Sequence, residues 1–333
     1  MDTAEDYRSF ARSARGSSPT YERLATAVAG DREVLGLLDA LPEPKRQPNL
    51  LFGAVRFLAG PVADAVEFRR WLLDHRSTVV AVMLARRTQT NEVGRCAILL
   101  PALAQLPGPL ALLEVGTSAG LCLLPDRYGY DYDGHWVGPP GAELVLPCSP
   151  RGPVPLPPSL PEVVWRAGID LHPIDVDDTE EVRWLEALIW PDQPERLERL
   201  RTAVRIARRE PPRIVEGNLL DELLPLAEEA PVDATLVVFH SAVLTTCRRR
   251  TARSSRHQCA RWEQCGCPTR PPTCCPNCRP TGCRPTSGRS CSAETARPSW
   301  PSPPPTAAGS TGGSERRRLG HRPPATRMTA PLT

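Results

Sequence analysis

The stretch from Leu110 to Gly120 constrains the fold of this chain more than any other segment. An apolar run, Leu110–Val115, stops at Gly116, and a second glycine, Gly120, follows four residues later. This pattern is typical of a buried parallel strand that turns tightly into a helix. We expect Gly116 to permit the turn and Gly120 to let the following helix approach the strand closely.

The small residues between the two glycines suit a loop that binds a ligand. Thr117, Ser118 and Ala119 are expected to leave backbone N–H groups exposed at the N-terminus of that helix, where an anionic group is favoured. Glu114, near the end of the strand, could fix the loop or accept a ligand amine. The loop lacks the Gly-Lys-Ser/Thr of a P-loop, and a serine replaces the middle glycine of the dinucleotide fingerprint. A cofactor loop and a plain strand–turn–helix connection therefore both stay open.

Strands and helices alternate after this loop. Further strands are predicted at residues 163–169, 213–216 and 234–239, and helices at 180–190, from Pro194 and at 220–228. Residues 124–164 are rich in proline, glycine and aromatics, and we expect an inserted hairpin followed by a Pro-rich loop. The alternation predicts an α/β fold with an open parallel sheet covered by helices.

The segment before the loop is expected to be helical throughout residues 3–105, with prolines as breaks. We therefore divide the chain into an N-terminal helical cap (1–108), a Rossmann-like α/β domain (109–244, with an insertion at 124–164) and a tail (245–333). The sheet is expected to be truncated after its fourth strand.

One polar run interrupts the helical segment. Residues 86–92 are all polar and lie between two apolar runs, and Arg95 follows them. The run could be a solvated loop. Alternatively, Gln89, Asn91, Glu92 and Arg95 point into a cleft, where amide, carboxylate and guanidinium groups would orient a polar ligand.

Polar residues also end the predicted strands. In an open parallel sheet, ligands bind beyond the carboxyl ends of the strands, where the strand order reverses. The candidates there are Glu114 with the glycine loop, Asp170, Asn218, and His240 with Ser241. An acidic residue that accepts a ribose hydroxyl usually falls about 20 residues after the loop. Asp170 comes 50 residues after Gly120, so the insertion must be looped out.

Several separate motifs resemble the family known as domain of unknown function 2332. They are R-R-T-Q-T-N-E-V-G-R-C, E-V-G-T-S-A-G-L, D-R-Y-G-Y-D-Y, W-R-A-G-I-D-L-H-P-I-D-V, W-L-E-A-L-I-W-P-D and L-V-V-F-H-S-A-V-L, and they span most of residues 5–244. The family has no settled activity, and its pattern is similar to that of class I S-adenosylmethionine-dependent methyltransferases. The resemblance therefore implies S-adenosylmethionine as a cofactor and a methyl acceptor that the sequence does not identify.

The resemblance also assigns roles to residues. The first cofactor motif would comprise Glu114, Gly116, Thr117, Ser118 and Gly120, with Asp170 at the ribose and Asn218 near the adenine. His240 and Ser241 would face the substrate, with His240 as the general base if one is used. The substrate side would comprise Gln89, Asn91, Glu92, Arg95 and Arg127. Asn218 stands where an aspartate is expected and Cys122 where the family tends to have asparagine.

Other functions remain as alternatives. A non-catalytic Rossmann-like protein that binds a nucleotide, or only a partner, has the same pattern. His135 and His172 with the aspartates at 170–178 show no diagnostic metal spacing, so we predict no metal site. His240 and Ser241 lack the G-x-S-x-G of a nucleophile elbow.

The composition changes abruptly after Leu244. Residues 245–333 hold 16 arginines, no lysine and three glutamates, so they carry +13, whereas the first 244 residues carry −10. Nine of the 12 cysteines lie in this tail, without repeated C-x2-C pairs, and the tail has no Ile, Val, Phe or Tyr with which to build a core. We predict a disordered tail produced by a frameshift in GC-rich coding DNA, rather than a zinc or nucleic-acid module.

The first 244 residues indicate the compartment. Their three scattered cysteines suit a reduced environment, the first 20 residues lack the apolar core of a secretory signal, and no apolar run reaches the roughly 18 residues that span a membrane. We therefore expect a cytoplasmic protein without a membrane partner.

Overall fold

The central strand forms where the sequence predicts it, and the sheet is built around it. In the computed structural model, which describes residues 2–241, β1 (Leu110–Val115) is buried along its whole length. Its neighbours are β5 (Val163–Asp170) and β7 (Thr235–His240), and β6 (Arg213–Glu216) pairs with β5. All pairs are parallel, and the order is β6-β5-β1-β7. The fold is mixed α/β, as predicted. The predicted tail lies outside the described residues.

The helices begin at residues that satisfy their first N–H groups. Aspartate, serine or asparagine side chains cap α1, α2, α3, α5, α8 and α10. The α-helices of the described region are α1 (Thr3–Ala14), α2 (Pro19–Gly30), α3 (Arg32–Asp39), α4 (Pro48–Phe57), α5 (Ala65–Asp74), α6 (Arg76–Ala85), α7 (Arg95–Leu103), α8 (Thr179–Leu188), α9 (Pro194–Arg209) and α10 (Leu219–Glu228). Short 3-10 helices lie at η1 (Glu43–Lys45), η2 (Leu121–Leu123) and η3 (Pro125–Arg127).

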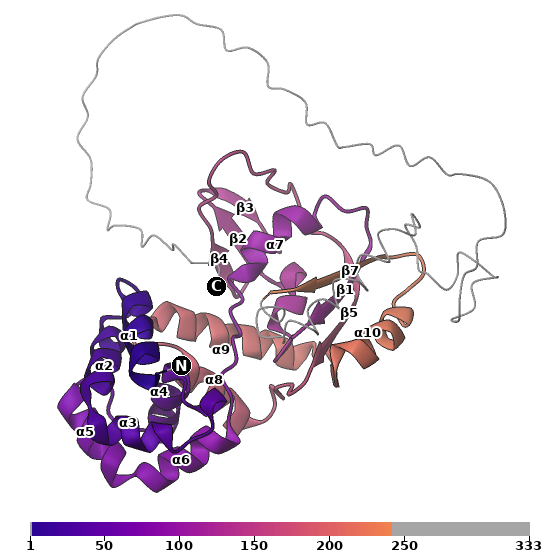
Figure 1. Ribbon diagram of the computed structural model, residues 1–333. Coiled ribbons are helices and arrows are strands. Elements are labelled where there is room, and N and C mark those ends of the chain that lie inside the picture. The colour runs from indigo at the N-terminus through magenta and orange to yellow at the C-terminus, as the bar shows by residue number, and fades with distance from the viewer. Residues whose placement is uncertain (1, 242–333) are drawn as a thin grey trace, which may run out of the picture. The chain divides into compact units, whose positions relative to one another are not determined.

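Helices α1–α6 share one aromatic core, and Figure 1 shows them gathered together. The Phe52 ring lies 4.8 Å from Tyr21 and 5.7 Å from Phe68, centroid to centroid. Trp184 of α8 joins this core, where its indole N–H donates to the Arg87 carbonyl at 2.8 Å. The helical segment and the α/β segment therefore share buried residues.

The sheet is covered on both faces. Leu113 and Val115 of β1 pack with α10, represented by Leu226, on one face. Leu110 and Leu112 point to the other face, where Leu103 of α7 and Leu123 of η2 cover them. Alternate residues of a strand point to opposite faces, so Glu114 shares the face covered by α7 and η2.

The expected insertion forms a small second sheet. β2 (Gly129–Tyr132) and β3 (His135–Val137) make an antiparallel hairpin, and β4 (Val145–Pro147) pairs in parallel with β2. The predicted hairpin is therefore confirmed. The buried tyrosines at 128, 130 and 132 each donate a hydrogen bond to a backbone carbonyl, which satisfies their hydroxyl groups.

The helix expected after the glycine loop is absent, and this prediction was wrong. The chain leaves Gly120 through the three-residue helix η2, and η3 starts at Pro125 without an intervening α-helix. Proline disfavours the helical conformation of the residue before it, which ends any helix within one turn of the loop. The close approach at Gly120 is instead to the start of β6, because an added Cβ would lie 2.6 Å from Pro212 Cγ.

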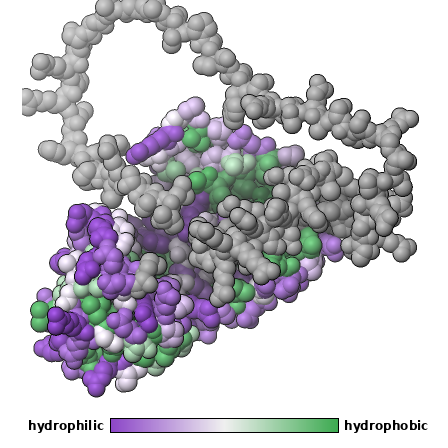
Figure 2. Space-filling view, in the orientation of Figure 1, coloured by the Kyte–Doolittle hydropathy of each residue, from purple (hydrophilic) through white to green (hydrophobic). Residues whose placement is uncertain are grey.

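The surface is mainly hydrophilic over the helical cluster, and Figure 2 shows hydrophobic residues gathered in the region of α7. Ile98, on α7, is 71 % exposed. Among the residues that the structure describes, no helix has the length and apolar character required to cross a membrane.

Candidate functional site

The glycine loop has an unusual backbone. Gly116, Ser118 and Gly120 all have positive φ angles, of 74°, 51° and 69°. Glycine adopts this region freely, but a serine there is strained by roughly 1–3 kcal/mol unless its surroundings compensate. The hydrogen bonds around Ser118 therefore carry part of the loop's stability.

The N–H groups of the loop are used within the protein. The Gly116 and Thr117 N–H groups donate to the Ile169 carbonyl at 2.8 and 3.3 Å, and the Gly120 N–H donates to the Thr117 carbonyl at 2.9 Å. The Ser118 and Ala119 N–H groups donate to side chains, as described below. The expectation of exposed donors at a helix N-terminus was therefore wrong, because no helix follows and distant residues supply the acceptors.

Asp170 lies against the loop, although 50 residues separate it from Gly120. Its Oδ2 accepts the Ser118 N–H at 2.7 Å, and its Oδ1 accepts the His172 N–H at 2.9 Å. Its carbonyl accepts the Gly217 N–H at 2.9 Å, which ties the end of β5 to the end of β6. The inserted segment is therefore looped out in the way that the prediction required.

The polar run at residues 86–92 also reaches the loop. Asn91 donates from Nδ2 to Ser118 Oγ at 2.9 Å and accepts the Ala119 N–H at 3.1 Å. Gln89 accepts a hydrogen bond from Ser118 Oγ and donates to the His172 carbonyl at 2.8 Å. Gln89 and Asn91 therefore contact the glycine loop, and their part in orienting a polar ligand stays a prediction. His172, whose backbone joins both sets of contacts, carried no sequence signal for this role.

Glu92 and Arg95 lie at the same end of α7 but face different partners. Glu92 forms ion pairs with Arg196 Nε at 2.5 Å and Arg199 Nε at 3.4 Å, both on α9. Arg95 donates from Nη1 to Ser241 Oγ at 2.7 Å. Arg196 and Arg199 are not among the predicted site residues, although their spacing of three residues places them on one face of α9.

Glu114 is buried and 2 % exposed at the end of the central strand. Burial raises its pKa to about 8, and the nearby Asp170 adds to the rise, while a hydrogen bond from Thr117 and the charge of Arg95 oppose it. Thr117 Oγ1 donates to Glu114 Oε2 at 2.9 Å. The side chain is therefore a neutral acid at pH 7, and it fixes the loop through Thr117.

His240 and Asn218 complete the set of strand ends. His240 is exposed and is paired in register with Val115, which places it beside the loop. Asn218 accepts the Leu220 N–H at 3.1 Å and so caps α10. It directly follows Gly217, which contacts Asp170, so the predicted adenine position lies next to the predicted ribose position.

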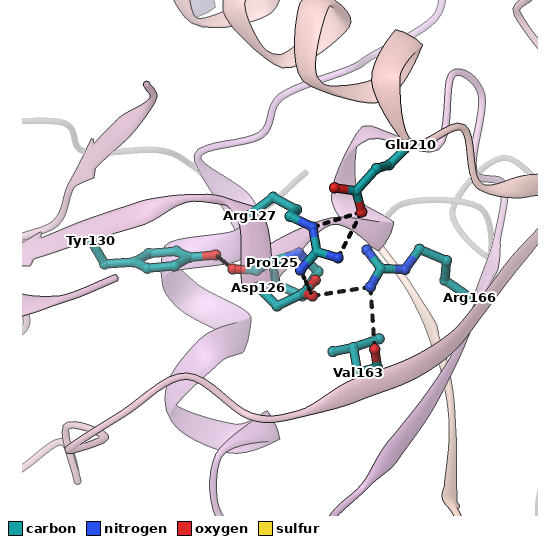
Figure 3. A network of polar contacts seen from close by, with 7 residues as sticks. All are labelled: Pro125, Asp126, Arg127, Tyr130, Val163, Arg166 and Glu210. Atoms are coloured by element: carbon teal, nitrogen blue, oxygen red, sulfur yellow. Dashed lines mark hydrogen bonds and ion pairs between the residues drawn. The ribbon is translucent and has the colours of Figure 1, made fainter. Parts of the chain in front are cut away.

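Arg127 pairs with residues other than those that contact the glycine loop. Figure 3 shows it in a separate network, where it pairs with Asp126 at 2.5 Å and with Glu210 at 2.6 Å. Arg166 of β5 also pairs with Asp126, at 3.0 Å. The side chains of Asp126 and Arg166 are 8 % and 14 % exposed. This network joins η3, β5 and the end of α9, and we assign it a structural role.

Two hollows lie on other parts of the described surface. The first, of about 410 Å³, is lined by Leu144, Pro194, Glu195, Glu198, Arg199 and Thr202. The second, of about 210 Å³, is lined by Arg127, Pro139, Pro140, Gly141, Ala142, Glu143, Ile206, Arg209 and Glu210. Neither includes the glycine loop. Within residues 2–241, no group of three or more His, Cys, Asp or Glu side chains is arranged to hold a metal ion.

Comparison with known proteins yields one match. No curated protein and no solved structure matches the chain. One family matches residues 4–270, which is most of the chain. It is domain of unknown function 2332, described as "uncharacterized protein conserved in bacteria". The protein therefore belongs to the domain of unknown function 2332 family.

Proposed function

We propose that this protein is a class I methyltransferase-like enzyme that binds S-adenosylmethionine at the carboxyl ends of β5 and β1. The observation that carries the proposal is the contact between Asp170 and the Ser118 N–H at 2.7 Å, which puts an acidic strand end beside a glycine loop. The strand order β6-β5-β1-β7 supports it, because this order reverses beside β1 as in a doubly wound sheet.

In this proposal the loop holds the sulfonium donor, with Asp170 at the ribose and Asn218 near the adenine. His240 and Ser241 face the acceptor, and His240 serves as general base if the acceptor needs one. Gln89, Asn91, Glu92 and Arg95 form the acceptor side, and catalysis rests mainly on alignment of donor and acceptor. Arg127 has no part in it, because it belongs to the network around Asp126.

Binding must exchange hydrogen bonds that the protein makes with itself. The carboxylate of Asp170 accepts from Ser118 and His172, and Gln89 and Asn91 contact the Ser118 hydroxyl. A ribose hydroxyl that bonds to Asp170 competes with the Ser118 and His172 N–H groups, and Gln89 and Asn91 hold Ser118 in its present position. We therefore propose that the Gln89 and Asn91 side chains move away from Ser118 when the cofactor enters.

A second candidate function is favoured by the same hydrogen bonds. Because the N–H groups of the loop already have acceptors, the loop can also be a purely structural connection. The protein would then be a non-catalytic Rossmann-like protein that binds a different nucleotide or only a partner.

Calorimetric titration of the full chain with S-adenosylmethionine, S-adenosylhomocysteine and NAD separates the two candidates. If the proposal is correct, the first two bind and the variant Asp170→Asn weakens them about tenfold or more, since a hydrogen bond to a charged group contributes roughly 1.5–3 kcal/mol. Asp177→Asn is the matched control, because Asp177 is 75 % exposed and pairs with Arg208 of α9. Absence of binding, or equal effects of both variants, would reject the cofactor assignment.

We further propose that the sequence after Leu244 arises from a frameshift and that the native protein is cytoplasmic. The change of composition supports the first statement, since reading one base earlier permits Tyr-Leu-Pro-Pro after residues 243–244. The family match continues to residue 270, so the boundary of the match does not coincide with this change. Resequencing codons 240–260 tests the frameshift, and an unchanged reading frame would exclude it.

A further inference from the structure

Arg95 lies at the carboxyl edge of the sheet without a carboxylate partner among the described residues. It begins α7 and is half-buried, and its Nη1 donates to the neutral hydroxyl of Ser241 at 2.7 Å. Ser241 follows β7, whose last residue pairs in register with Val115 before the glycine loop. The guanidinium therefore lies beside the proposed cofactor site.

The nearest acidic residue along the chain is already shared by other cations. Glu92 pairs with Arg196 and Arg199, and its side chain is 14 % exposed. Burial lowers the pKa of Arg196, Glu92 opposes this shift, and the like charges of Arg199 and Arg95 add to it. Arg196 and Arg199 thus share one carboxylate that is largely shielded from water, and Arg95 adds a third positive charge close to them.

Neither of the other nearby carboxyl groups among the described residues forms an ion pair with Arg95. Glu114 is close enough to Arg95 for the two to interact electrostatically, but it is protonated at pH 7 because burial raises its pKa to about 8. Asp170 accepts hydrogen bonds from the Ser118 and His172 N–H groups and, among the described residues, forms no ion pair with Arg95. Shielded positive charge is costly unless it is paired, so the arrangement favours an anion from outside the described residues.

We propose that Arg95 binds an anionic group, a carboxylate or a phosphate, of a ligand seated at the carboxyl edge of β1 and β7. The planar guanidinium fork suits both groups, and Arg196 and Arg199, which pair with Glu92, supply additional positive field. Resting on the proposed function, this assigns an anionic acceptor substrate to the enzyme. The opposite side of the site holds the cofactor loop and Asp170.

Titration of the full chain with inorganic phosphate and with succinate, at low salt, tests this inference. We expect at least one of them to bind, and Arg95→Gln to weaken binding about tenfold or more, because a hydrogen bond to a charged group contributes roughly 1.5–3 kcal/mol. The probe that binds more tightly identifies the anion class. Arg201→Gln is the matched control, since Arg201 is an exposed arginine of α9 that pairs with Glu186 and Glu198. We expect the control to change the affinity less than about twofold, as exposed charges are screened.

Two more variants keep the test decisive. Glu92→Gln removes the carboxylate that Arg196 and Arg199 share, so it should tighten anion binding. Loss of structure would weaken anion binding, so it cannot produce this result. Arg95→Lys keeps the charge without the fork and should fall between the wild type and Arg95→Gln. Circular dichroism checks that each variant is folded. If the wild type binds neither probe, or if folded Arg95→Gln binds as the wild type does, the inference is wrong.

The outcome separates this inference from the proposed function. Binding of S-adenosylhomocysteine is measured in parallel on the same samples. Phosphate or succinate binding that depends on Arg95, without binding of S-adenosylhomocysteine, rejects the methyltransferase and keeps the anion site. Binding of S-adenosylhomocysteine without binding of either anion rejects the anion site and keeps the methyltransferase.

Discussion

Replacing Glu114 by glutamine should raise the free energy of unfolding. The wild type should lose stability as the pH rises from about 4.5 to about 8, and the variant should lose much less. The pKa of Glu114 rises from 4.5 to about 8, chiefly because the side chain is buried. In the unfolded chain the carboxyl loses its proton near pH 4.5, whereas the folded protein keeps it until about pH 8. The folded state therefore binds more protons across this window, and its stability falls as the pH rises through it.

The size of the effect follows from the shift. Each pKa unit corresponds to about 1.4 kcal/mol, so the shift from 4.5 to about 8 gives an upper limit of about 5 kcal/mol for the penalty above pH 8. Glutamine is neutral at every pH and has nearly the same shape. Its amide oxygen can accept the Thr117 hydroxyl, which donates to Glu114 Oε2 at 2.9 Å in the wild type.

Urea unfolding at pH 5, 6, 7 and 8, followed by circular dichroism, measures the effect. We expect the free energy of unfolding of Glu114→Gln to exceed that of the wild type by an amount that grows from pH 5 to pH 8. Glu216→Gln is the control, since Glu216 is an exposed carboxylate at the end of β6. If the wild type and Glu114→Gln give parallel pH profiles, Glu114 is not held neutral and the reasoning fails.

Two further predictions concern packing and buried charge. An added Cβ at Gly168 would lie 2.5 Å from Thr117 Cγ2, so Gly168→Ala should lower the free energy of unfolding in urea by about 1–3 kcal/mol. Gly36 lies in open space on α3, so Gly36→Ala should raise it by roughly 0.5–1 kcal/mol. Equal effects would contradict the close contact. Asp126→Ala leaves the largely buried Arg166 without its carboxylate, while Arg127 keeps Glu210, and should cost about 3–5 kcal/mol. Glu210→Gln removes a carboxylate that is 52 % exposed and should cost less than about 1 kcal/mol. Comparable losses would contradict the structural role of this network.

The strands could be predicted because their signal is local. β1 and β6 have the predicted bounds, and β5 extends one residue beyond its prediction. Each is an apolar or β-branched run bounded by proline, glycine or polar residues, and this is the pattern that a buried parallel strand requires. The hairpin of β2 and β3 could be predicted for the same reason, because the alternating tyrosines keep one face of β2 buried.

The helix after Gly120 was predicted wrongly because the loop depends on residues far along the chain. A strand followed by two glycines usually continues into a helix, whose N-terminus then leaves donors exposed. Here Asn91, 28 residues before Ala119, and Asp170, 52 residues after Ser118, take those donors instead. A local pattern contains no information about such partners. Arg127 lies within a family motif, yet it pairs with Asp126 and Glu210. A motif alone does not show whether an arginine binds a ligand or belongs to a structural network.

The hydrogen bonds of the loop bear on folding and on ligand binding at once. Ser118 is held at a positive φ by contacts from Gln89, Asn91 and Asp170, and these contacts offset a strain of roughly 1–3 kcal/mol. A ligand that displaces them without replacing them would leave the loop strained, so it would bind weakly. A ligand with hydroxyl donors and carbonyl or carboxylate acceptors at matching positions would restore the same pairings. Selectivity at this site should therefore follow hydrogen-bond complementarity to the loop more than apolar contact area, and a ribose meets that requirement better than an apolar ring does.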